Sequence, residues 1–458
     1  MYKLLQWKLA ILAKLYLWKY KPMIIGVTGN AGKTSTKEMI GAVVSQVKKV
    51  RVAGGNLNNE IGLPLTILGS WDKEYYDRGS SLGFWFKVLI VSWWSLFIGQ
   101  NYPEVLVLEY GADHPGDIKR LVVKYKPHIS VVTTIGDVPV HIEYFSAKGG
   151  SASGGKNGAD AVADEKANLI KVLSANDYAI LNHDDQRVLD MKSKTKAQVL
   201  TYGFDQGATI RVSDIEYVSD NEGRLLGVTF KLNEEHHFAP VRIIGSLGKS
   251  QAWSSAAAAA IGSVLEMNLV QVSEALKTYH GPKGRLKILR GIKNSNIIDD
   301  TYNASPASTR LALETLKEIK KVSSDASVGA RRAVAILGDM LELGEYSEKA
   351  HYDIGALASE IVDILVCVGS RAKVIASAFT KATADAGIAS SKEVFIFDNS
   401  SDAKSKVQEL IHAHDLILVK GSQGMRMEKI VEVIMAEPQQ AKQLLVRQSK
   451  RWLNRRGS

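Results

Sequence analysis

Short apolar runs alternate with stretches of helical periodicity along the first part of the chain. Each run is followed by a segment in which apolar residues recur at every third or fourth position. This alternation is typical of a mostly parallel β-sheet that is covered by helices on both faces. The expected strands are 23–27, 105–108, 129–133 and 178–181, and the expected helices are 34–47, 116–124 and 160–173.

The pattern changes over residues 208–245, where alternating strands with turns (210–218 and 225–232) predict antiparallel additions to the sheet. Two helices, 251–265 and 269–279, close this domain. Residues 281–284 (GPKG) are typical of a hinge, and after them the α/β alternation restarts. The expected strands are 297–299, 333–337, 364–368, 394–397 and 416–419, and the expected helices are 306–321, 346–360, 403–412 and 425–435.

The predicted fold class is therefore α/β, with two domains. A mostly parallel sheet of the P-loop ATPase type is followed by a smaller α/β domain that is similar to a dinucleotide fold but lacks its Gly-x-Gly-x-x-Gly fingerprint. Ligands in such sheets bind beyond the carboxyl ends of the strands, so we expect an active site in a cleft between the domains. The predicted segments are a basic helix (1–21), a central domain (22–283) with an apolar insertion (84–98) and a flexible Gly-rich loop (146–161), a C-terminal domain (284–436) and a basic tail (437–458).

Charge is unevenly distributed along this chain of 458 residues, whose net charge is +10. Residues 1–21 contain five lysines and no acid, and residues 441–458 contain six basic residues and no acid. Because the excess lies at the two ends, a membrane surface or a solvated helix face explains it as well as a nucleic acid does, and we expect no nucleic-acid partner. The single cysteine, Cys367, excludes a disulfide within the chain and fits a reducing cytoplasm.

Two segments are unusually rich in aromatic residues. Residues 1–21 mix tryptophan and tyrosine with lysine and lack a secretory cleavage site, which predicts an amphipathic helix. That helix either lies on the inner face of an anionic membrane or packs on the following domain. The run 84–98 is short for a bilayer span and contains Lys87, so it either dips into the membrane or packs against the first helix.

Residues 26–36 (GVTGNAGKTST) carry the strongest chemical signal. They lie between an apolar strand and a helix, where backbone N–H groups and the helix N-terminus bind phosphate. Lys33 is placed to reach the terminal phosphates, and the hydroxyl of Thr34 is placed to ligate Mg²⁺. The alternative is an ordinary Gly-rich turn, but Gly-Lys-Thr in this context favours a site for a nucleoside triphosphate.

Three further residues are ambiguous when they are read alone. Glu109 ends a strand, where it either binds Mg²⁺ or is a solvated acid. His141 follows the next strand and is either a ligand of a second cation or a loop histidine. Lys166 lies within a helical pattern and, from the residues alone, is a surface lysine.

Several motifs together resemble the Mur ligase family, in particular its D-alanyl-D-alanine-adding members, from residue 22 to about 435. The motifs are residues 28–36 (TGNAGKTST), 55–64 (GNLNNEIGLP), 109–112 (EYGA), 115–118 (PGDI), 299–306 (DDTYNASP), 337–344 (LGDMLELG) with His351, and 420–425 (KGSQGM). The resemblance implies an ATP-dependent ligase that joins a carboxylate to an amine. The carboxylate takes the γ-phosphate to give an acyl phosphate and ADP, and the amine then displaces phosphate.

The resemblance also implies a role for each residue that matches a motif. Lys33, His141, Lys166 and Arg285 are the implied catalytic residues. Mg²⁺ is implied at Thr34, Glu109, His141 and Lys166, the last as a carbamylated lysine. The acceptor loop is implied to contribute Asn56, Asn58, Asn59 and Glu60. ATP is implied to bind at Thr28, Gly29, Asn30, Ala31, Gly32, Lys33, Thr34, Ser35, Gln251, Arg285, Asp300 and Asn303.

The resemblance implies that the substrates are UDP-MurNAc-tripeptide and D-alanyl-D-alanine. It also implies that the enzyme acts in peptidoglycan synthesis, in the cytoplasm and as a monomer. The family usually has a separate N-terminal domain that holds the UDP end, whereas only about twenty residues precede the first strand here. Two alternatives therefore stay open. One is a Mur-type ligase with a different acceptor, either without UDP or linked to a lipid. The other is a membrane-associated nucleotide-binding scaffold that has lost catalysis.

Overall fold

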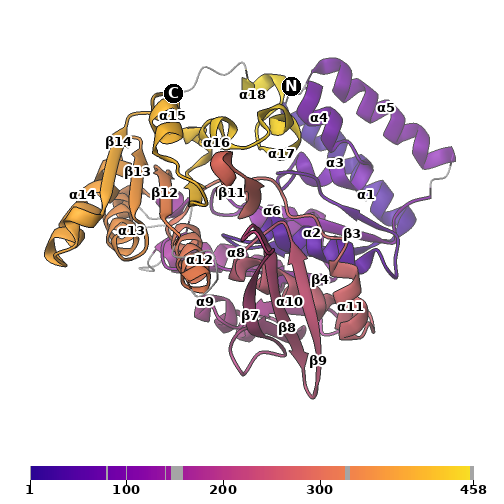
Figure 1. Cartoon of the computed structure of the whole chain (residues 1–458). Helices are drawn as coiled ribbons and strands as arrows, with labels where there is room; N and C mark the ends of the chain where they lie inside the picture. The colour runs from indigo at the N-terminus through magenta and orange to yellow at the C-terminus, as the bar shows by residue number, and fades with distance from the viewer. Residues whose placement is uncertain are drawn as a thin grey trace.

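The computed structural model describes residues 2–78, 81–98, 101–139, 141–145, 158–324 and 331–453. Within these residues the chain forms two α/β domains, each built on its own sheet (Figure 1). The first sheet has nine strands in the order β2-β3-β1-β4-β5-β6-β7-β8-β9, and the second has six in the order β10-β11-β15-β12-β13-β14. The predicted fold class is confirmed.

The first sheet is parallel from β2 to β7 and ends in an antiparallel pair of hairpins. Its central strands are apolar on both faces because helices cover both faces. In the register, Val27 of β1 faces Glu109 of β3. The strands are β1 (Met23–Thr28), β2 (Val50–Val52), β3 (Val105–Glu109), β4 (Ile129–Val132), β5 (Tyr178–Asn182), β6 (Gln198–Gly203), β7 (Ile210–Ser219), β8 (Leu225–Glu234) and β9 (His237–Ile244).

Two groups of helices cover the faces of this sheet. On one face α2, α10 and α11 bury a core in which the alanines of α10 allow close approach to α2. On the other face α1, α3, α5, α6 and α8 bury a second core. The helices are α1 (Tyr2–Tyr20), α2 (Lys33–Val44), α3 (Gly62–Leu68), α4 (Asp72–Arg78), α5 (Leu82–Ile98), α6 (Asp117–Lys124), α7 (Ile142–Phe145), α8 (Gly158–Lys171), α9 (Gln186–Leu189), α10 (Lys249–Val264) and α11 (Leu269–Leu276).

The second sheet is parallel except at β10, which pairs antiparallel with β11. Helices α12, α13 and α14 cover one face, and α15, α16 and α17 cover the other. The strands are β10 (Lys287–Arg290), β11 (Asn296–Asp300), β12 (Ala333–Gly338), β13 (Ile364–Val368), β14 (Glu393–Phe397) and β15 (Leu416–Lys420). The helices are α12 (Pro306–Ser324), α13 (Ser347–Ile361), α14 (Ala372–Asp385), α15 (Ser400–Leu410), α16 (Glu428–Ile434), α17 (Ala441–Leu444) and α18 (Lys450–Leu453).

The two aromatic segments both fold as helices that pack on the central domain. α1 buries Tyr16, whose hydroxyl donates to the carbonyl of Ser92 in α5 at 2.8 Å. Both segments thus adopt the packed arrangement that the sequence left open. Among the described helices, none combines the length and the apolar character needed to cross a bilayer.

The predicted Gly-rich loop, 146–161, is described only in part. Residues 146–157 lie outside the described residues, and residues 158–161 form the first turn of α8 rather than a loop. The basic segment after residue 437 contains α17 and α18, which follow a 3₁₀ turn (Pro438–Gln440). Figure 1 shows both helices next to α16 and β11, at the junction of the two domains.

Candidate active site

The phosphate-binding loop lies at the carboxyl end of β1. Gly29 and Gly32 have positive φ angles of 142° and 82°, and a Cβ on Gly29 would stand 1.9 Å from the Thr133 hydroxyl. Gly29 leaves no room for a Cβ, and the positive φ angle of Gly32 favours glycine at that position. The Lys33 ammonium curls over the loop and donates to the carbonyls of Gly29 at 2.8 Å and Asn30 at 3.2 Å. Burial lowers the pKa of Lys33, and the nearby Glu109 carboxylate opposes this shift.

Glu109 ends β3 beside this loop and is almost fully buried. It accepts hydrogen bonds from the Lys37 ammonium at 3.1 Å and from the Asn58 amide at 3.4 Å. Burial by itself would raise the pKa of Glu109, but the charges of Lys37 and Lys33 outweigh burial and hold it below the usual range. The carboxylate is therefore ionised and available to a cation.

Lys37 was not among the predicted site residues. Its side chain is fully buried and donates both to Glu109 and to the carbonyl of Gly55, at 3.1 Å each. The spacing held the signal, because residues four apart on a helix face the same side, and Lys37 follows Lys33 by one turn of α2.

Lys166 is buried on α8, with 3% of its surface exposed, so the prediction of a surface lysine from the residues alone was wrong. Burial, followed by the charge of Lys33, lowers the pKa of Lys166 from 10.5 to about 7. A substantial fraction of this amine is therefore neutral at physiological pH. A neutral amine is the form that reacts with CO₂, so the environment of Lys166 fits carbamylation.

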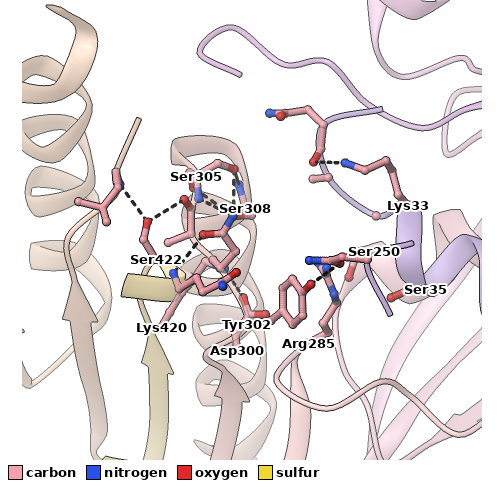
Figure 2. Close-up of a pocket in the computed structure, with 18 of the residues that line it drawn as sticks. Lys33, Ser35, Ser250, Arg285, Asp300, Tyr302, Ser305, Ser308, Lys420 and Ser422 are labelled. Carbon is pink, nitrogen blue, oxygen red and sulfur yellow. Dashed lines mark hydrogen bonds and ion pairs between the residues drawn. The ribbon is translucent and has the colours of Figure 1, made fainter. Parts of the chain in front are cut away.

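Contacts from the hinge and the second domain reach the loop. The Arg285 guanidinium donates to the Thr34 hydroxyl at 3.1 Å and stacks on the ring of Tyr302, 4.1 Å from its centroid. The Tyr302 hydroxyl donates to the side-chain oxygen of Asn56, and Figure 2 shows Tyr302 and Arg285 side by side. These contacts join the two domains across the site.

The opposite wall is built around Asp300, at the end of β11. One carboxylate oxygen accepts from the Lys420 ammonium at 2.5 Å, and the other accepts from the backbone N–H of Leu286 at 3.2 Å. Lys420 also donates to the carbonyl of Asn303 at 3.0 Å (Figure 2). The backbone N–H of Gln423 donates to the side chain of Asn303 at 3.3 Å. The wall presents polar groups that suit a nucleoside.

A cleft of about 650 Å³ separates these two walls. Many of the predicted site residues line it: Asn30, Ala31, Gly32, Lys33, Ser35, Asn56, Asn58, Glu109, His141, Gln251, Arg285, Asp300 and Asn303. Thr28, Gly29, Thr34 and Lys166 are not among the residues that line it. Asn59 and Glu60 line a smaller adjoining pocket of about 200 Å³, which shares Asn58 and Asp113 with the cleft.

His141 links the central domain to the second domain. One ring nitrogen lies 3.0 Å from the Glu342 carboxylate and the other lies 3.5 Å from Asp113. The neighbouring His141 imidazole lowers the pKa of Glu342. No group of three or more histidine, cysteine or acidic residues that could enclose a metal occurs among the described residues. The donors near the loop, Glu109 and Thr34, instead fit Mg²⁺, which takes few protein ligands and completes its shell with phosphate and water.

The C-terminal segment adds residues that the sequence did not predict. Arg447 donates to the carbonyl of Thr301 and to the Glu428 carboxylate, at 3.0 Å each. Trp452 lines the cleft, with the Arg426 guanidinium 5.4 Å from its ring. The described part of the segment beyond residue 437 thus packs on the second domain and contributes Trp452 to the cleft wall.

Family models match most of the chain. The Mur ligase middle domain matches residues 27–75 and 95–262, and the Mur ligase glutamate ligase domain matches residues 284–423. The chain is 28% identical to the UDP-N-acetylmuramoyl-tripeptide–D-alanyl-D-alanine ligase of Bacillus subtilis, over 93% of this chain and 79% of that protein. It is 27% identical to the Escherichia coli protein of the same name, over 90% of this chain and 76% of that protein.

Solved structures give the same picture of the fold. MurF ligase from Thermotoga maritima in complex with ADP has a TM-score of 0.70 at 22% identity, covering 95% of this chain and 84% of that one. Folylpolyglutamate synthase/dihydrofolate synthase from Yersinia pestis, complexed with AMPPNP and Mn, has a TM-score of 0.56 at 16% identity, covering 91% of this chain and 90% of that one. At these identities the likeness is one of fold.

Proposed function

Because this chain belongs to the Mur ligase family, we propose that it adds D-alanyl-D-alanine to UDP-MurNAc-tripeptide and converts ATP to ADP and phosphate. The relatives described above carry this activity in their names and align over nine-tenths of the chain. The observation that carries the proposal is the cleft in which the phosphate loop, Glu109 and the Arg285–Tyr302 pair meet. The proposed site of action is the cytoplasm, which supplies ATP, and the proposed active form is a monomer.

The phosphate end of ATP would bind at the loop of β1. The loop N–H groups, the N-terminus of α2 and Lys33 supply positive potential where the phosphates carry negative charge. The nucleoside end would meet Asp300, Asn303 and Gln251 on the far side of the cleft. Two solved structures of the same fold contain ADP and AMPPNP, which supports binding of a nucleotide by this fold.

The chemistry begins when a carboxylate oxygen of the acceptor peptide attacks the γ-phosphorus of ATP. An oxygen–phosphorus bond forms, the bond to the β-phosphate oxygen breaks, and ADP leaves. Lys33 and Arg285 oppose the charge that develops on the transferred group, and little else is required of the protein beyond alignment. The dipeptide amine then attacks the acyl carbon and phosphate departs with the bonding pair, while the amine loses its proton.

Glu109 and Thr34 would hold Mg²⁺, which would neutralise phosphate charge during transfer. A carbamate on Lys166 would put a negative charge close to Lys33 and would supply an oxygen ligand for a cation. His141, which lies close to Asp113 and Glu342, would supply one nitrogen ligand to a second cation. The acceptor peptide would lie along Asn56, Asn58, Asn59 and Glu60, which connect the cleft to the adjoining pocket.

The direct test is phosphate release from ATP by the purified protein, with UDP-MurNAc-tripeptide and D-alanyl-D-alanine omitted in turn. We expect release only when both are present, together with a pentapeptide product of the expected mass. The variant Lys33→Met controls for contaminating ATPases. Release with the dipeptide and another acceptor, but not with the UDP-tripeptide, would favour the ligase of altered acceptor. ATP binding without release in any combination would favour the scaffold.

A further inference from the structure

α1 has apolar side chains on two opposite sides. Leu9, Leu12, Ala13 and Tyr16 face the protein and are buried. On the other side a second apolar row runs along the helix, with successive members three or four positions apart, which keeps them on one face. Its members are Leu4, Trp7, Ile11, Leu15 and Trp18, and the two tryptophans are 61% and 75% exposed. We call this row the outer stripe of α1.

Lysines flank the outer stripe on both sides. With 3.6 residues per turn, Lys8 and Lys19 lie along one edge of the stripe, and Lys3 and Lys14 lie along the other. All four are exposed, and none forms an ion pair with any described residue. Residues 1–21 include no acidic side chain, so the surface around the stripe is strongly positive.

α5 repeats the arrangement next to α1. It buries Phe84, Trp85, Val88 and Ser92 against the protein, and turns a second apolar face outward. That outer face of α5 contains Phe86, Ile90, Trp93, Trp94 and Phe97, of which Trp94 and Phe97 are 62% and 69% exposed. The backbone carbonyls of Ser92 and Leu96 accept from Tyr16 and Lys19 of α1. The two helices therefore pack against each other at one corner of the molecule (Figure 1).

We propose that the outer stripe of α1 and the outer face of α5 form a docking surface for an anionic lipid bilayer. The chain would lie on the bilayer with both helices in the interfacial layer, at the depth where helices of this kind bury their apolar face. The tryptophans would sit at the level of the lipid headgroups, which is where tryptophan concentrates in membrane proteins. The flanking lysines would extend along their alkyl stems to the headgroup phosphates.

The charge of this surface favours an anionic bilayer over a second copy of the chain as the binding partner. An outer face that met a second copy of the chain would bring two acid-free, lysine-edged surfaces together, which repel each other. A lipid surface with negative headgroups instead pairs with all four lysines at once, whatever their exact spacing. The exposed apolar area is also far more continuous than the scattered apolar residues that a monomer ordinarily exposes. This surface stands apart from the cleft, so the proposal does not depend on which substrate the enzyme uses.

The test is co-sedimentation of the full chain with vesicles of phosphatidylcholine and phosphatidylglycerol, compared with phosphatidylcholine alone. We expect binding to the anionic vesicles that weakens as salt rises, with a blue shift of tryptophan emission. The triple variant Lys3→Gln/Lys8→Gln/Lys14→Gln should lower the partition coefficient by about a hundredfold, since each lysine near an anionic surface contributes roughly fivefold. Lys19 is kept because it bonds to α5.

A second variant tests the apolar part. Trp7→Ser/Trp18→Ser/Trp94→Ser should abolish binding and the emission shift while leaving the unfolding midpoint and phosphate release in lipid-free solution unchanged. Two matched controls lie far from this corner: Lys192→Gln/Lys196→Gln/Lys381→Gln removes three exposed charges, and Phe238→Ser/Val270→Ser removes two exposed apolar groups of β9 and α11. Both controls should bind like the unaltered chain.

Three outcomes would overturn the proposal. They are equal sedimentation with and without anionic lipid, binding that the triple lysine variant retains in full, and a dimer in lipid-free solution that the Trp7→Ser/Trp18→Ser/Trp94→Ser variant converts to monomer. The ligase assay is run on the same preparations without lipid, so loss of the proposed activity and loss of lipid binding are observed separately.

Discussion

Each wall of the cleft contains one buried lysine–carboxylate pair, but the two pairs have different surroundings. Lys37 and Glu109 lie 3.1 Å apart on the central domain, and the pKa values of Glu109 and Lys166 also respond to Lys33. Lys420 and Asp300 lie 2.5 Å apart on the second domain. Their remaining hydrogen bonds are to backbone groups, the N–H of Leu286 and the carbonyl of Asn303. The first wall has more cationic side chains than its carboxylate neutralises, which suits a polyanion, whereas the second is balanced and suits an uncharged nucleoside.

The largest effect is expected from breaking the first pair. Lys37→Met leaves Glu109 buried without its closest cation, and removing one partner of a buried pair costs about 3–5 kcal/mol of stability. Urea unfolding of the ligand-free protein measures this change. The variant should also bind ATP and Mg²⁺ poorly, because the pKa of Glu109 then rises through the effect of burial.

The double variant Lys37→Met/Glu109→Gln tests whether the stability lost in Lys37→Met comes from leaving the Glu109 charge unpaired. With both charges gone, most of the lost stability should return, while ligation stays absent because the carboxylate needed for Mg²⁺ is missing. If the double variant is as unstable as the sum of the two single variants, Lys37 and Glu109 do not act as a pair.

The next effect concerns Lys166 and depends on pH. Between pH 7 and pH 10.5 the unfolded chain keeps a proton that the folded protein has released, so the free energy of unfolding rises with pH in this window. Lys166→Met removes that part of the slope, and it should make the protein more stable than the unaltered chain at pH 7. The measurement is urea unfolding across this range in CO₂-free buffer.

Turnover should depend on the same titration of Lys166, but here the lysine is needed and Lys166→Met should lower the rate. Below about pH 7 the protonated amine cannot react with CO₂, so activity in bicarbonate-depleted buffer should fall, and added bicarbonate should restore it most clearly just above that pH. Lys166→Met should lose about 10²-fold or more in turnover, the size of effect seen when one preorganised charge is removed. Turnover that is unaffected by both the substitution and bicarbonate would contradict the carbamate.

A smaller effect is expected at the second wall. Asp300→Asn keeps an acceptor for the N–H of Leu286 but loses the charge that faces Lys420, so the KM for ATP should rise about tenfold with little change in kcat. The control is Asp415→Asn, which breaks the Arg332–Asp415 pair in the same domain, away from the cleft. That control should lower stability without changing the KM for ATP.

The contrast between the walls also explains which parts the sequence could predict. The strands that end at the cleft are continuous apolar runs, so their positions followed from local pattern, and the loop residues followed from their spacing around Lys33. The strands β2, β6 and β10 were missed, and so were several helices, among them α3 (Gly62–Leu68), α4 (Asp72–Arg78) and α14, since their patterns are short or mixed. Local pattern therefore predicted the fold class and the phosphate side of the site.

The parts that were missed depend on contacts between segments distant in the chain. Tyr302 reaches Asn56 and Glu342 reaches His141 only after the two domains fold against each other. Trp452 reaches Arg426 only after the C-terminal segment folds back onto the second domain. No spacing rule reports such contacts. The burial of Lys166 is of the same kind, because it follows from the packing of α8 against α6, α7 and the sheet rather than from the residues beside it.

The smallest effect, and the one that most sharpens the contrast, concerns Trp452. Its ring contacts the guanidinium groups of Arg426 and Arg447 at 5.4 Å and 5.8 Å, and such contacts contribute about 0.5–1 kcal/mol each at partly exposed sites. Trp452→Ala should therefore raise the KM of the substrate that contacts this wall by about three- to tenfold, with kcat nearly unchanged.

Two control variants go with this prediction. Trp452→Phe keeps an aromatic face and should bring the KM most of the way back to that of the unaltered chain. Leu453→Ala, at an exposed neighbouring position, should leave the KM unchanged. Separate KM values for ATP, the acceptor and the dipeptide identify which substrate is affected. If all three KM values match those of Leu453→Ala, Trp452 packs on the second domain without touching a substrate. The substrate-binding surface of the second wall would then include Asp300 and Lys420 but not Trp452.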